Sequence, residues 1–273
     1  MDIQRLISAF VIVIVILGAV IFLPQHLLLV LVALIVGVSN WEFFRLRFSF
    51  LTSVFASIVL AILMIFTLSL GSFYYLLLLS AFLWLALGIL TITFPHSKEF
   101  VQNSILSWVS GTIIHLSFWY SVSIIILQPE LGDKTFNIDS RYLLILLISL
   151  SASMDTLAYF GGRKFGKQKF LKNISPNKTL EGFLIAIGIV PIIFTILFIF
   201  ITNLPAFYLY MIFLITGLFS VLGDAVASLF KRVAGAKDSS NLIPGHGGFF
   251  DRVDSHLAAI PMFVLISLII FSI

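Results

Sequence analysis

The chain alternates between long apolar runs and shorter polar connections. Most runs are apolar on every face and long enough to cross the roughly 30 Å hydrocarbon core of a bilayer as helices. A transmembrane barrel would need alternating polarity, and lipid offers no partner for a free backbone amide. We therefore predict an all-α membrane protein with about nine transmembrane helices. Their predicted positions are 7–23, 27–40, 48–70, 72–94, 104–127, 142–160, 183–201, 205–230 and 257–273.

The second predicted helix is shorter than the others. It ends in a polar stretch that contains Gly37, Ser39 and Asn40. A short apolar run spans a bilayer poorly, so we expect this helix to be tilted or only partly inserted.

The positively charged residues predict the orientation of the chain, because loops on the cytoplasmic side carry an excess of Lys and Arg. With the amino terminus and Arg5 in the cytoplasm, only Lys134 and Arg141 of the 16 cations fall on the far side. The two long polar loops, 161–182 and 231–256, then share the cytoplasmic face. We expect a multi-pass protein of the cell (inner) membrane with its active site on that face.

Composition supports the membrane assignment and excludes several chemistries. Hydrophobic residues make up 60% of the chain and charged residues 10%, with a mean hydropathy of +1.17. Soluble domains are about one quarter charged. The sequence contains no cysteine, which excludes disulfides, zinc–thiolate sites and thiol catalysis.

The polar residues divide the chain into two parts. Residues 1–140 form an amino-terminal part of about five helices with brief loops, and residues 141–273 form the predicted catalytic region. Loops 161–182 and 231–256 of that region far exceed the 2–8 residues that usually connect helices, which favours a functional role. We find no internal repeat, so an inverted-repeat transporter is not supported.

Segment 228–254 contains the strongest candidate site. Helical spacing places Asp224, Ser228 and Lys231 on one face of the eighth predicted helix. A glycine-rich stretch, in which the backbone can approach a ligand closely, follows at 244–248. Carboxylates suit Mg²⁺, and nearby Lys and Arg side chains suit phosphates, so the segment favours a metal–nucleotide site.

Simpler interpretations remain open for several of these residues. Lys231 and Arg232 also satisfy the charge rule for cytoplasmic loops. Asp251 and Arg252, taken alone, are typical of a surface ion pair. A local pair between Glu42 and Arg45 is the simplest account of the charges that end the second predicted helix.

Two carboxylates lie within or at the ends of apolar runs, Asp155 and Asp224. A charge inside the membrane is costly, about 2.5–3.5 kcal/mol on insertion scales, and therefore marks a functional candidate. For Asp155, a wetted position at the interface explains the residue equally well. In the adjoining loop, Thr179 is a predicted helix cap, and Lys178 beside it is typical of a phosphate site.

Segment 228–254 resembles the signature of the phosphatidate cytidylyltransferases, also called CDP-diacylglycerol synthases. The residues that carry the resemblance are Ser228, Lys231-Arg232, Lys237-Asp238, Pro244–Gly248, Asp251-Arg252 and Asp254. The 155–182 loop is similar to a second block of this family, in which Asn177 and Leu180 depart from the usual residues. The roles of those two positions stay open.

The resemblance implies a reaction and a cofactor. CTP and phosphatidate would react to give CDP-diacylglycerol and pyrophosphate. A divalent cation, Mg²⁺, would bind to Asp224 and Asp251, in association with K⁺. The partners implied are thus CTP and a membrane lipid, with no nucleic acid; a homodimer is one option for the oligomeric state.

The resemblance also suggests roles for other residues of the site. Lys231, Arg232, Lys237 and Arg252 are expected to contact phosphates, and Lys178 and Arg163 to face the lipid head group. His246 would orient a phosphate or the loop. The remaining expected site residues are Asp155, Ser228, Asp238, Gly245, Gly247, Gly248 and Asp254. The alternatives are a CTP-dependent polyprenol or dolichol kinase and, in a different class, a membrane transporter.

Overall fold

The computed structural model describes residues 3–69, 74–128, 136–243 and 245–271. Lys134 of the predicted outer loop and Pro244 of the glycine-rich turn lie outside the described residues. The helices are α1 (Ile3–Phe22), α2 (Gln25–Arg45), α3 (Phe50–Ser69), α4 (Tyr74–Ile92), α5 (Lys98–Val101), α6 (Ser104–Leu127), α7 (Ser140–Phe165), α8 (Leu180–Ile199), α9 (Ala206–Val233) and α10 (Phe250–Phe271). The strands are β1 (Lys169–Leu171) and β2 (Ser175–Thr179).

Each of the predicted spans corresponds to one long helix in the described part of the chain. Eight of these helices, α2 to α4 and α6 to α10, are long and apolar enough to cross a membrane. In α1, Val13–Phe22 is an apolar section within the part of the helix whose side chains the structure describes. An all-α membrane protein is therefore confirmed in its main architecture, whereas the ninth span and the cytoplasmic position of the amino terminus stay predictions.

Helix α2 corrects the prediction for the second span. It continues through the polar stretch to Arg45 and is 21 residues long. The polar residues do not end the helix because they have partners on α6: the Asn40 amide donates to the Gly111 carbonyl at 3.1 Å, and Ser39 Oγ lies 3.1 Å from His115 Nε2. His115 is thus a polar residue of helix packing, as predicted.

The two predicted loops contain more regular structure than expected. Helix α7 continues to Phe165 and α10 begins at Phe250, so both loops are shorter than predicted. Within the first loop, β1 and β2 pair antiparallel, with Lys169 opposite Thr179. Strands of three and five residues are too short for periodicity to reveal, and this hairpin was missed.

Local capping explains where α8 begins. Thr179 is its N-cap and accepts a hydrogen bond from the Gly182 amide at 3.2 Å, as the sequence predicted. The Glu181 carboxylate accepts hydrogen bonds from the backbone amides of Lys167 at 2.9 Å and Gln168 at 3.1 Å. The hairpin is therefore tied to the first turn of α8, which positions Lys178 of β2.

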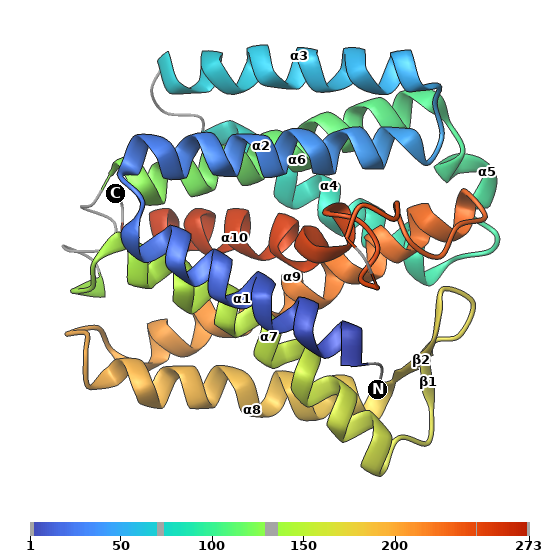
Figure 1. Ribbon diagram of the computed structural model, residues 1–273. Helices are drawn as coiled ribbons and strands as arrows, with labels where there is room; N and C mark the ends of the chain where they lie inside the picture. The colour runs from blue at the N-terminus through green and yellow to red at the C-terminus, as the bar shows by residue number, and fades with distance from the viewer. Residues whose placement is uncertain (1–2, 70–73, 129–135, 244, 272–273) are drawn as a thin grey trace.

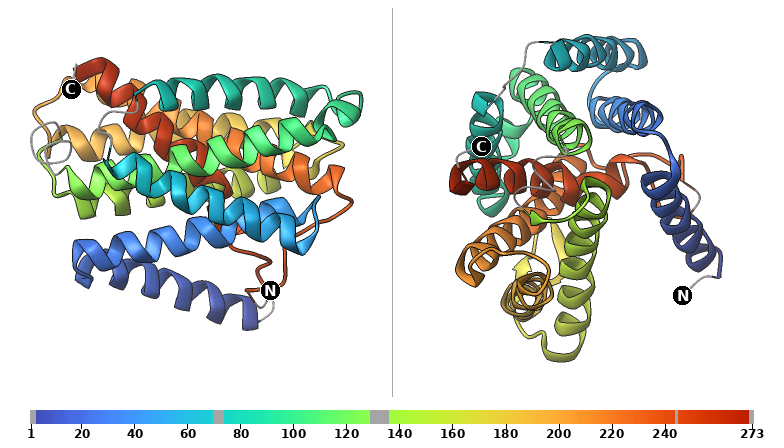
Figure 2. Two further views of the ribbon diagram at one scale, coloured as in Figure 1. Left: turned by 90° about the horizontal axis from the view of Figure 1, so that it is seen from above. Right: turned by 90° about the vertical axis from the view of Figure 1, so that its left-hand side faces the viewer.

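Helix α10 lies at the centre of the bundle. It contacts α2, α4, α6, α7 and α9, and the first two views show it enclosed by its neighbours (Figures 1 and 2). It thereby joins the amino-terminal helices to the carboxyl-terminal helices. Its position explains how residues from both parts of the chain meet at one site.

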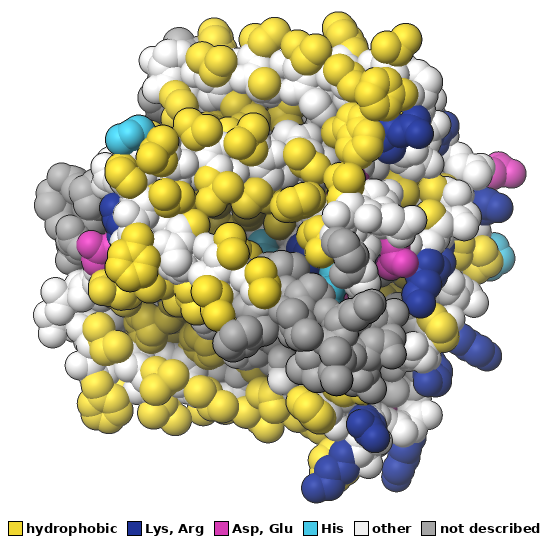
Figure 3. All heavy atoms as spheres, viewed as in Figure 1, with side chains coloured by type: hydrophobic (Ala, Val, Ile, Leu, Met, Phe, Trp, Pro, Cys, Tyr) yellow, Lys and Arg dark blue, Asp and Glu magenta, His cyan; other side chains and the backbone are white. Residues whose placement is uncertain are grey.

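The cations gather at one end of the bundle. Figure 3 shows most of the visible Lys and Arg side chains at the end that carries the β-hairpin, whereas the sides of the bundle are covered by hydrophobic side chains. The two long polar loops thus share one end, as their charge predicted.

Candidate active site

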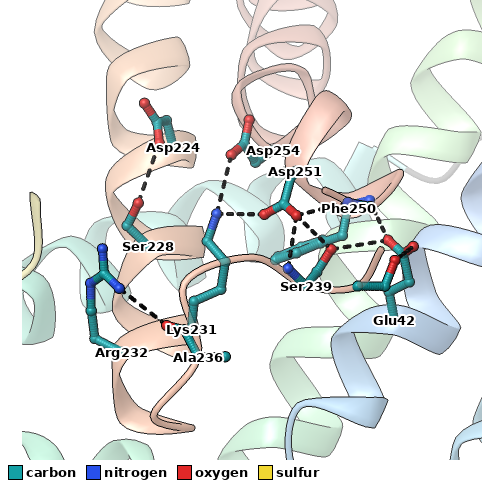
Figure 4. Close-up of polar contacts among 12 residues, drawn as sticks. Glu42, Asp224, Ser228, Lys231, Arg232, Ala236, Ser239, Phe250, Asp251 and Asp254 are labelled. Atoms are coloured by element: carbon teal, nitrogen blue, oxygen red, sulfur yellow. Dashed lines mark hydrogen bonds and ion pairs between the residues drawn. The ribbon is translucent and has the colours of Figure 1, made fainter. Parts of the chain in front are cut away.

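Close contact between α9 and α10 brings the acidic residues of the site together. A Cβ atom at Gly223 would lie 2.5 Å from the Asp254 carbonyl oxygen, so only glycine allows the two backbones to approach this closely. Asp224 follows on α9, while Asp251 and Asp254 lie on the first turns of α10 (Figure 4). The predicted carboxylates therefore share one site.

Lys231 is a residue of α9 whose side chain reaches the start of α10. Its Nζ is 2.6 Å from Asp251 Oδ1 and 4.0 Å from Asp254 Oδ2 (Figure 4). The Lys231 side chain is only 10% exposed, and a buried cation requires such partners. Asp251 therefore pairs with Lys231, and the interpretation of Asp251 and Arg252 as a surface ion pair is wrong.

Asp224 is held by the hairpin and by its own helix. Lys178 of β2 forms an ion pair with Asp224 Oδ2, and Ser228 Oγ lies 3.4 Å from Asp224 Oδ1. The second contact confirms the predicted helical face. Burial acts to lower the pKa of Lys178, but the nearby carboxylates, Asp224 foremost, outweigh it and raise that pKa above its usual value. Lys178 therefore stays protonated through the neutral range.

Asp155 adds a carboxylate from α7. It lies close enough to Asp224 and Asp254 for their charges to interact, and Ser255 Oγ is 3.5 Å from its Oδ2. Together with Lys178 and Asp224, it lines a cavity of about 270 Å³. This position favours the functional interpretation of Asp155 over that of an incidental interfacial residue.

Asp251 also organises the loop between α9 and α10. Its Oδ2 atom accepts hydrogen bonds from the Ser239 amide at 2.7 Å, the Ser239 hydroxyl at 2.9 Å and the Gly248 amide at 2.9 Å. The Gly248 amide, in the stretch predicted to approach a ligand, thus donates to Asp251 in this structure. One carboxylate holds both the loop and Lys231.

Glu42 of α2 also belongs to the site, although the sequence did not predict it. It is fully buried and accepts hydrogen bonds from Ser240 Oγ at 2.6 Å, the Phe250 amide at 2.7 Å and Ser239 Oγ at 3.1 Å (Figure 4). Arg45 instead donates to the Phe48 carbonyl at 3.3 Å, so the predicted Glu42–Arg45 pair is wrong. The position of Glu42 near the end of an apolar run was the signal in the sequence that could have indicated a functional role.

The glycine-rich turn makes room for these two carboxylates. Gly247 has a φ of +79°, which favours glycine, and a Cβ there would lie 2.6 Å from Asp251 Oδ2. A Cβ at Gly248 would lie 2.5 Å from Glu42 Oε1. The turn is therefore built around carboxylates from α2 and α10, which explains why glycine occupies both positions.

Replacing Glu42 with glutamine should loosen this loop. The glutamine amide nitrogen would face hydrogen-bond donors, so at least one buried polar group would lose its partner. We expect the free energy of unfolding to fall by about 1–3 kcal/mol. Thermal melting and limited proteolysis within 234–249 measure the effect in detergent.

Glu99 offers a matched control, because it is exposed in the first turn of α5. The Glu99→Gln protein should melt and be cleaved like the original. If Glu42→Gln gave the same result as this control, Glu42 would not hold the loop.

Several predicted contacts lie outside this cluster. Arg232 donates from Nε to the Ile174 carbonyl at 3.0 Å and from Nη1 to the Ala236 carbonyl at 3.2 Å, so it supports the hairpin and the loop. Arg163 is exposed in the last turn of α7. Four other predicted residues lie in the segment that follows α9: Lys237 and Asp238 are exposed in the loop, and Gly245 and His246 form the turn. Arg252 of α10 lines a separate hollow.

The acidic residues suit a divalent cation, although no compact metal cage is present among the described residues. No group of three or more His, Asp or Glu side chains there is arranged to hold a metal ion. Mg²⁺ typically needs only one or two carboxylates, with phosphates and water as its other ligands. Asp224 and Asp251 both lie near Lys231, and neither contacts the other directly. This donor set fits Mg²⁺ bound together with a phosphate ligand.

Comparisons with known proteins show the family to which the sequence is similar. A sequence profile described as the cytidylyltransferase family matches residues 3–270. The chain is 34% identical to a phosphatidate cytidylyltransferase of Haemophilus influenzae, over 95% of this chain and 96% of the relative. A Pseudomonas aeruginosa protein of the same name is 32% identical, over 95% and 94% of the two chains. One from Bacillus subtilis is 45% identical over 122 residues, or 44% and 45% of the two chains.

Proposed function

Because the chain belongs to the cytidylyltransferase family, we propose that its site transfers the cytidylyl group of CTP to phosphatidate. The products are CDP-diacylglycerol, which stays in the membrane, and pyrophosphate. The activity is that of a nucleotidyltransferase of phospholipid biosynthesis. Similarity over nearly the whole chain to the Haemophilus and Pseudomonas enzymes is the observation that carries this conclusion.

The reaction joins two anions. A phosphate oxygen of phosphatidate attacks the α-phosphorus of CTP, and the bond from that phosphorus to the β-phosphate oxygen breaks. The phosphate oxygen is already a nucleophile near neutral pH, so no general base is needed. The main requirements are neutralisation of charge and in-line placement.

Lys178 and Lys231 are suited to neutralise substrate charge. Each already pairs with a carboxylate, Asp224 and Asp251 respectively, at the end of the bundle where the cations gather. Phosphate oxygens bring additional negative charge, which these lysines can share. Charge-assisted hydrogen bonds of this kind are short and strong. The carboxylates thereby hold the lysines in place before the substrates arrive.

The carboxylates Asp224 and Asp251 would hold Mg²⁺. When bound, this ion would stabilise the negative charge that develops on the leaving pyrophosphate. Asp224 Oδ1 has Ser228 as a distant partner at 3.4 Å, which leaves it available as a ligand. The associated K⁺ belongs to the same proposal and is tested by exchanging potassium for sodium salts.

The basic end of the bundle faces the cytoplasm in this proposal. CTP is a cytoplasmic nucleotide, and Lys and Arg are enriched in cytoplasmic loops. Bacterial relatives favour the cell (inner) membrane as the location.

Labelled CTP tests the reaction directly. With purified protein, Mg²⁺ and phosphatidate, we expect label in the cytosine ring to enter the lipid fraction and label in the γ-phosphate to leave as pyrophosphate. Removal of the divalent cation with EDTA should abolish both. Thin-layer chromatography of the lipid and aqueous fractions measures the products.

The competing functions give other results. A polyprenol or dolichol kinase would place the γ-phosphate in the lipid and leave the cytosine label in water. A transporter would move solute across vesicles in the absence of CTP. Either result, together with no cytidylylated lipid, would contradict the proposed function.

A further inference from the structure

An apolar hollow lies on the side of α10 away from the carboxylates. It has a volume of about 150 Å³ and is lined by side chains of α1, α2, α6, α7 and α10. In Figure 3 the surface is hollowed between α1 and α2, and hydrophobic side chains surround this hollow. We call it the α1–α10 groove; Ala19, Leu28, Val122, Leu144 and Ile260 are among its apolar walls.

Two residues of α10 are the polar members of this lining, Arg252 and His256. Both ring nitrogens of His256 are buried and form no hydrogen bond of ordinary distance and angle among the described residues, although the Ile148 backbone lies close to the ring. A buried polar group without a partner costs about 1–3 kcal/mol. His256 thus indicates a ligand that enters the groove and supplies a hydrogen-bonding group.

The other buried histidine of the membrane region shows the contrast. Nitrogens of His115 lie 2.7 Å from the Gly111 carbonyl and 3.1 Å from Ser39 Oγ. Helix packing therefore gives both nitrogens of His115 a partner, whereas the His256 nitrogens in the hollow form no hydrogen bond of ordinary geometry.

The spacing of Arg252 and His256 matches the layers of a lipid. The two residues are four positions apart, which corresponds to about 6 Å along a helix. The head-group layer of a bilayer is roughly 5–7 Å thick on each side of the hydrocarbon core. With Arg252 at the level of the phosphate, His256 lies at the level of the ester carbonyls, and the apolar walls follow at the level of the acyl chains.

The groove also lies next to the carboxylates of the site along α10. Arg252 directly follows Asp251 in the first turn of α10. Asp251 and Asp254 contact Lys231, while Arg252 and His256 face the groove. A lipid phosphate held by Arg252 would therefore lie beside the site described above.

We propose that the α1–α10 groove binds the first carbons of one acyl chain of the lipid substrate, with the lipid phosphate against Arg252 and an ester carbonyl accepting a hydrogen bond from His256. This inference rests on the proposed function for the identity of the lipid. It places the lipid on the α1–α2 side of α10, rather than beside Lys178 and Arg163. The second acyl chain stays in the surrounding bilayer.

An ester-to-ether exchange in the substrate tests the role of His256. Dialkyl phosphatidate lacks the ester carbonyls, so its KM should be roughly tenfold higher than that of diacyl phosphatidate. His256→Ala should raise the KM for the diacyl lipid by a similar factor and leave no further loss with the ether lipid. His256→Gln, which retains an N–H donor, should restore most of the ester preference. The KM for CTP and the value of kcat should stay unchanged.

His115→Ala is the matched control. It removes a histidine that has partners, so it should lower the melting temperature and keep the ester preference. If His256→Ala kept the same ester-to-ether ratio as the original protein, the proposed hydrogen bond would be refuted.

A binding assay makes the proposal independent of turnover. The chain has no cysteine, so Ala19→Cys places a single thiol in the groove and Val13→Cys, at an exposed position of α1, places one facing lipid. Dioleoyl phosphatidate should slow maleimide labelling of the first thiol by roughly tenfold and leave the second unchanged. Glycerol 3-phosphate, which has no acyl chain, should protect neither.

The outcomes separate this inference from the proposed function. Protection of Ala19→Cys without cytidylyl transfer would retain the groove and reject the reaction. Cytidylyl transfer without protection would retain the reaction and reject the groove. Equal protection by diacylglycerol, which lacks the phosphate, would overturn the role of Arg252.

Discussion

The protein with Asp251 replaced by asparagine should turn over CTP and phosphatidate at least about a hundredfold more slowly, with its helices still folded. Asp251 Oδ1 lies 2.6 Å from Nζ of Lys231, and the Lys231 side chain is only 10% exposed. Asparagine removes the charge that holds Lys231. Its amide group must also face either Lys231 or the backbone donors of Ser239 and Gly248. Initial rates at several CTP and Mg²⁺ concentrations in detergent measure the loss.

Asp139 gives the matched control for this substitution. It caps α7 by accepting a hydrogen bond from the Arg141 amide at 2.7 Å, at the other end of a helix of 26 residues. Asparagine caps helices as well as aspartate, so Asp139→Asn should change neither rate nor melting temperature. Near-normal turnover by Asp251→Asn would remove Asp251 from the site. Loss of rate together with loss of helical circular dichroism would instead indicate a role in folding.

The Asp224→Asn protein should show a loss of similar size, again roughly a hundredfold or more. Asp224 pairs with Lys178 and lies near Asp155 and Asp254, at the point where α7, α9 and α10 meet. In the proposed mechanism it is a ligand of the divalent cation. We therefore expect its replacement to weaken Mn²⁺ binding, measured by electron paramagnetic resonance of the purified protein without substrates.

A double substitution separates the two roles of Asp224. If its only task were to balance the charge of Lys178, then Asp224→Asn combined with Lys178→Met would bind Mn²⁺ like the original protein. A ligand cannot be replaced in this way, so we expect Mn²⁺ binding to stay weak in the double variant. Normal Mn²⁺ binding by either protein would show that Asp224 is no metal ligand.

Interactions between near neighbours in the chain were predictable. Thr179 was recognised as a cap because a cap binds an amide only three residues away. Ser228 and Asp224 were placed together because helical geometry puts residues four apart on one face. The apolar runs were recognised because lipid requires long helices with no exposed backbone.

Interactions between distant segments were not predictable in this way. Glu42 was assigned to Arg45, its neighbour in sequence, but its partners are Ser239, Ser240 and Phe250, which lie about 200 residues further along the chain. The hairpin was missed because its position depends on Glu181 and Asp224 rather than on a periodic pattern of its own. For the same reason Arg232 was assigned to a ligand, and the structure shows it bound to backbone carbonyls.

Composition and local spacing were thus sufficient for the membrane class, the main helices and the segment that carries the chemistry. Tertiary structure alone decided which carboxylate meets which lysine, that α2 contributes to the loop, and that a groove opens beside His256. The physical reason is range: periodicity and capping act over a few residues. The ion pairs and the packing of α10 instead depend on how helices from both parts of the chain enclose it.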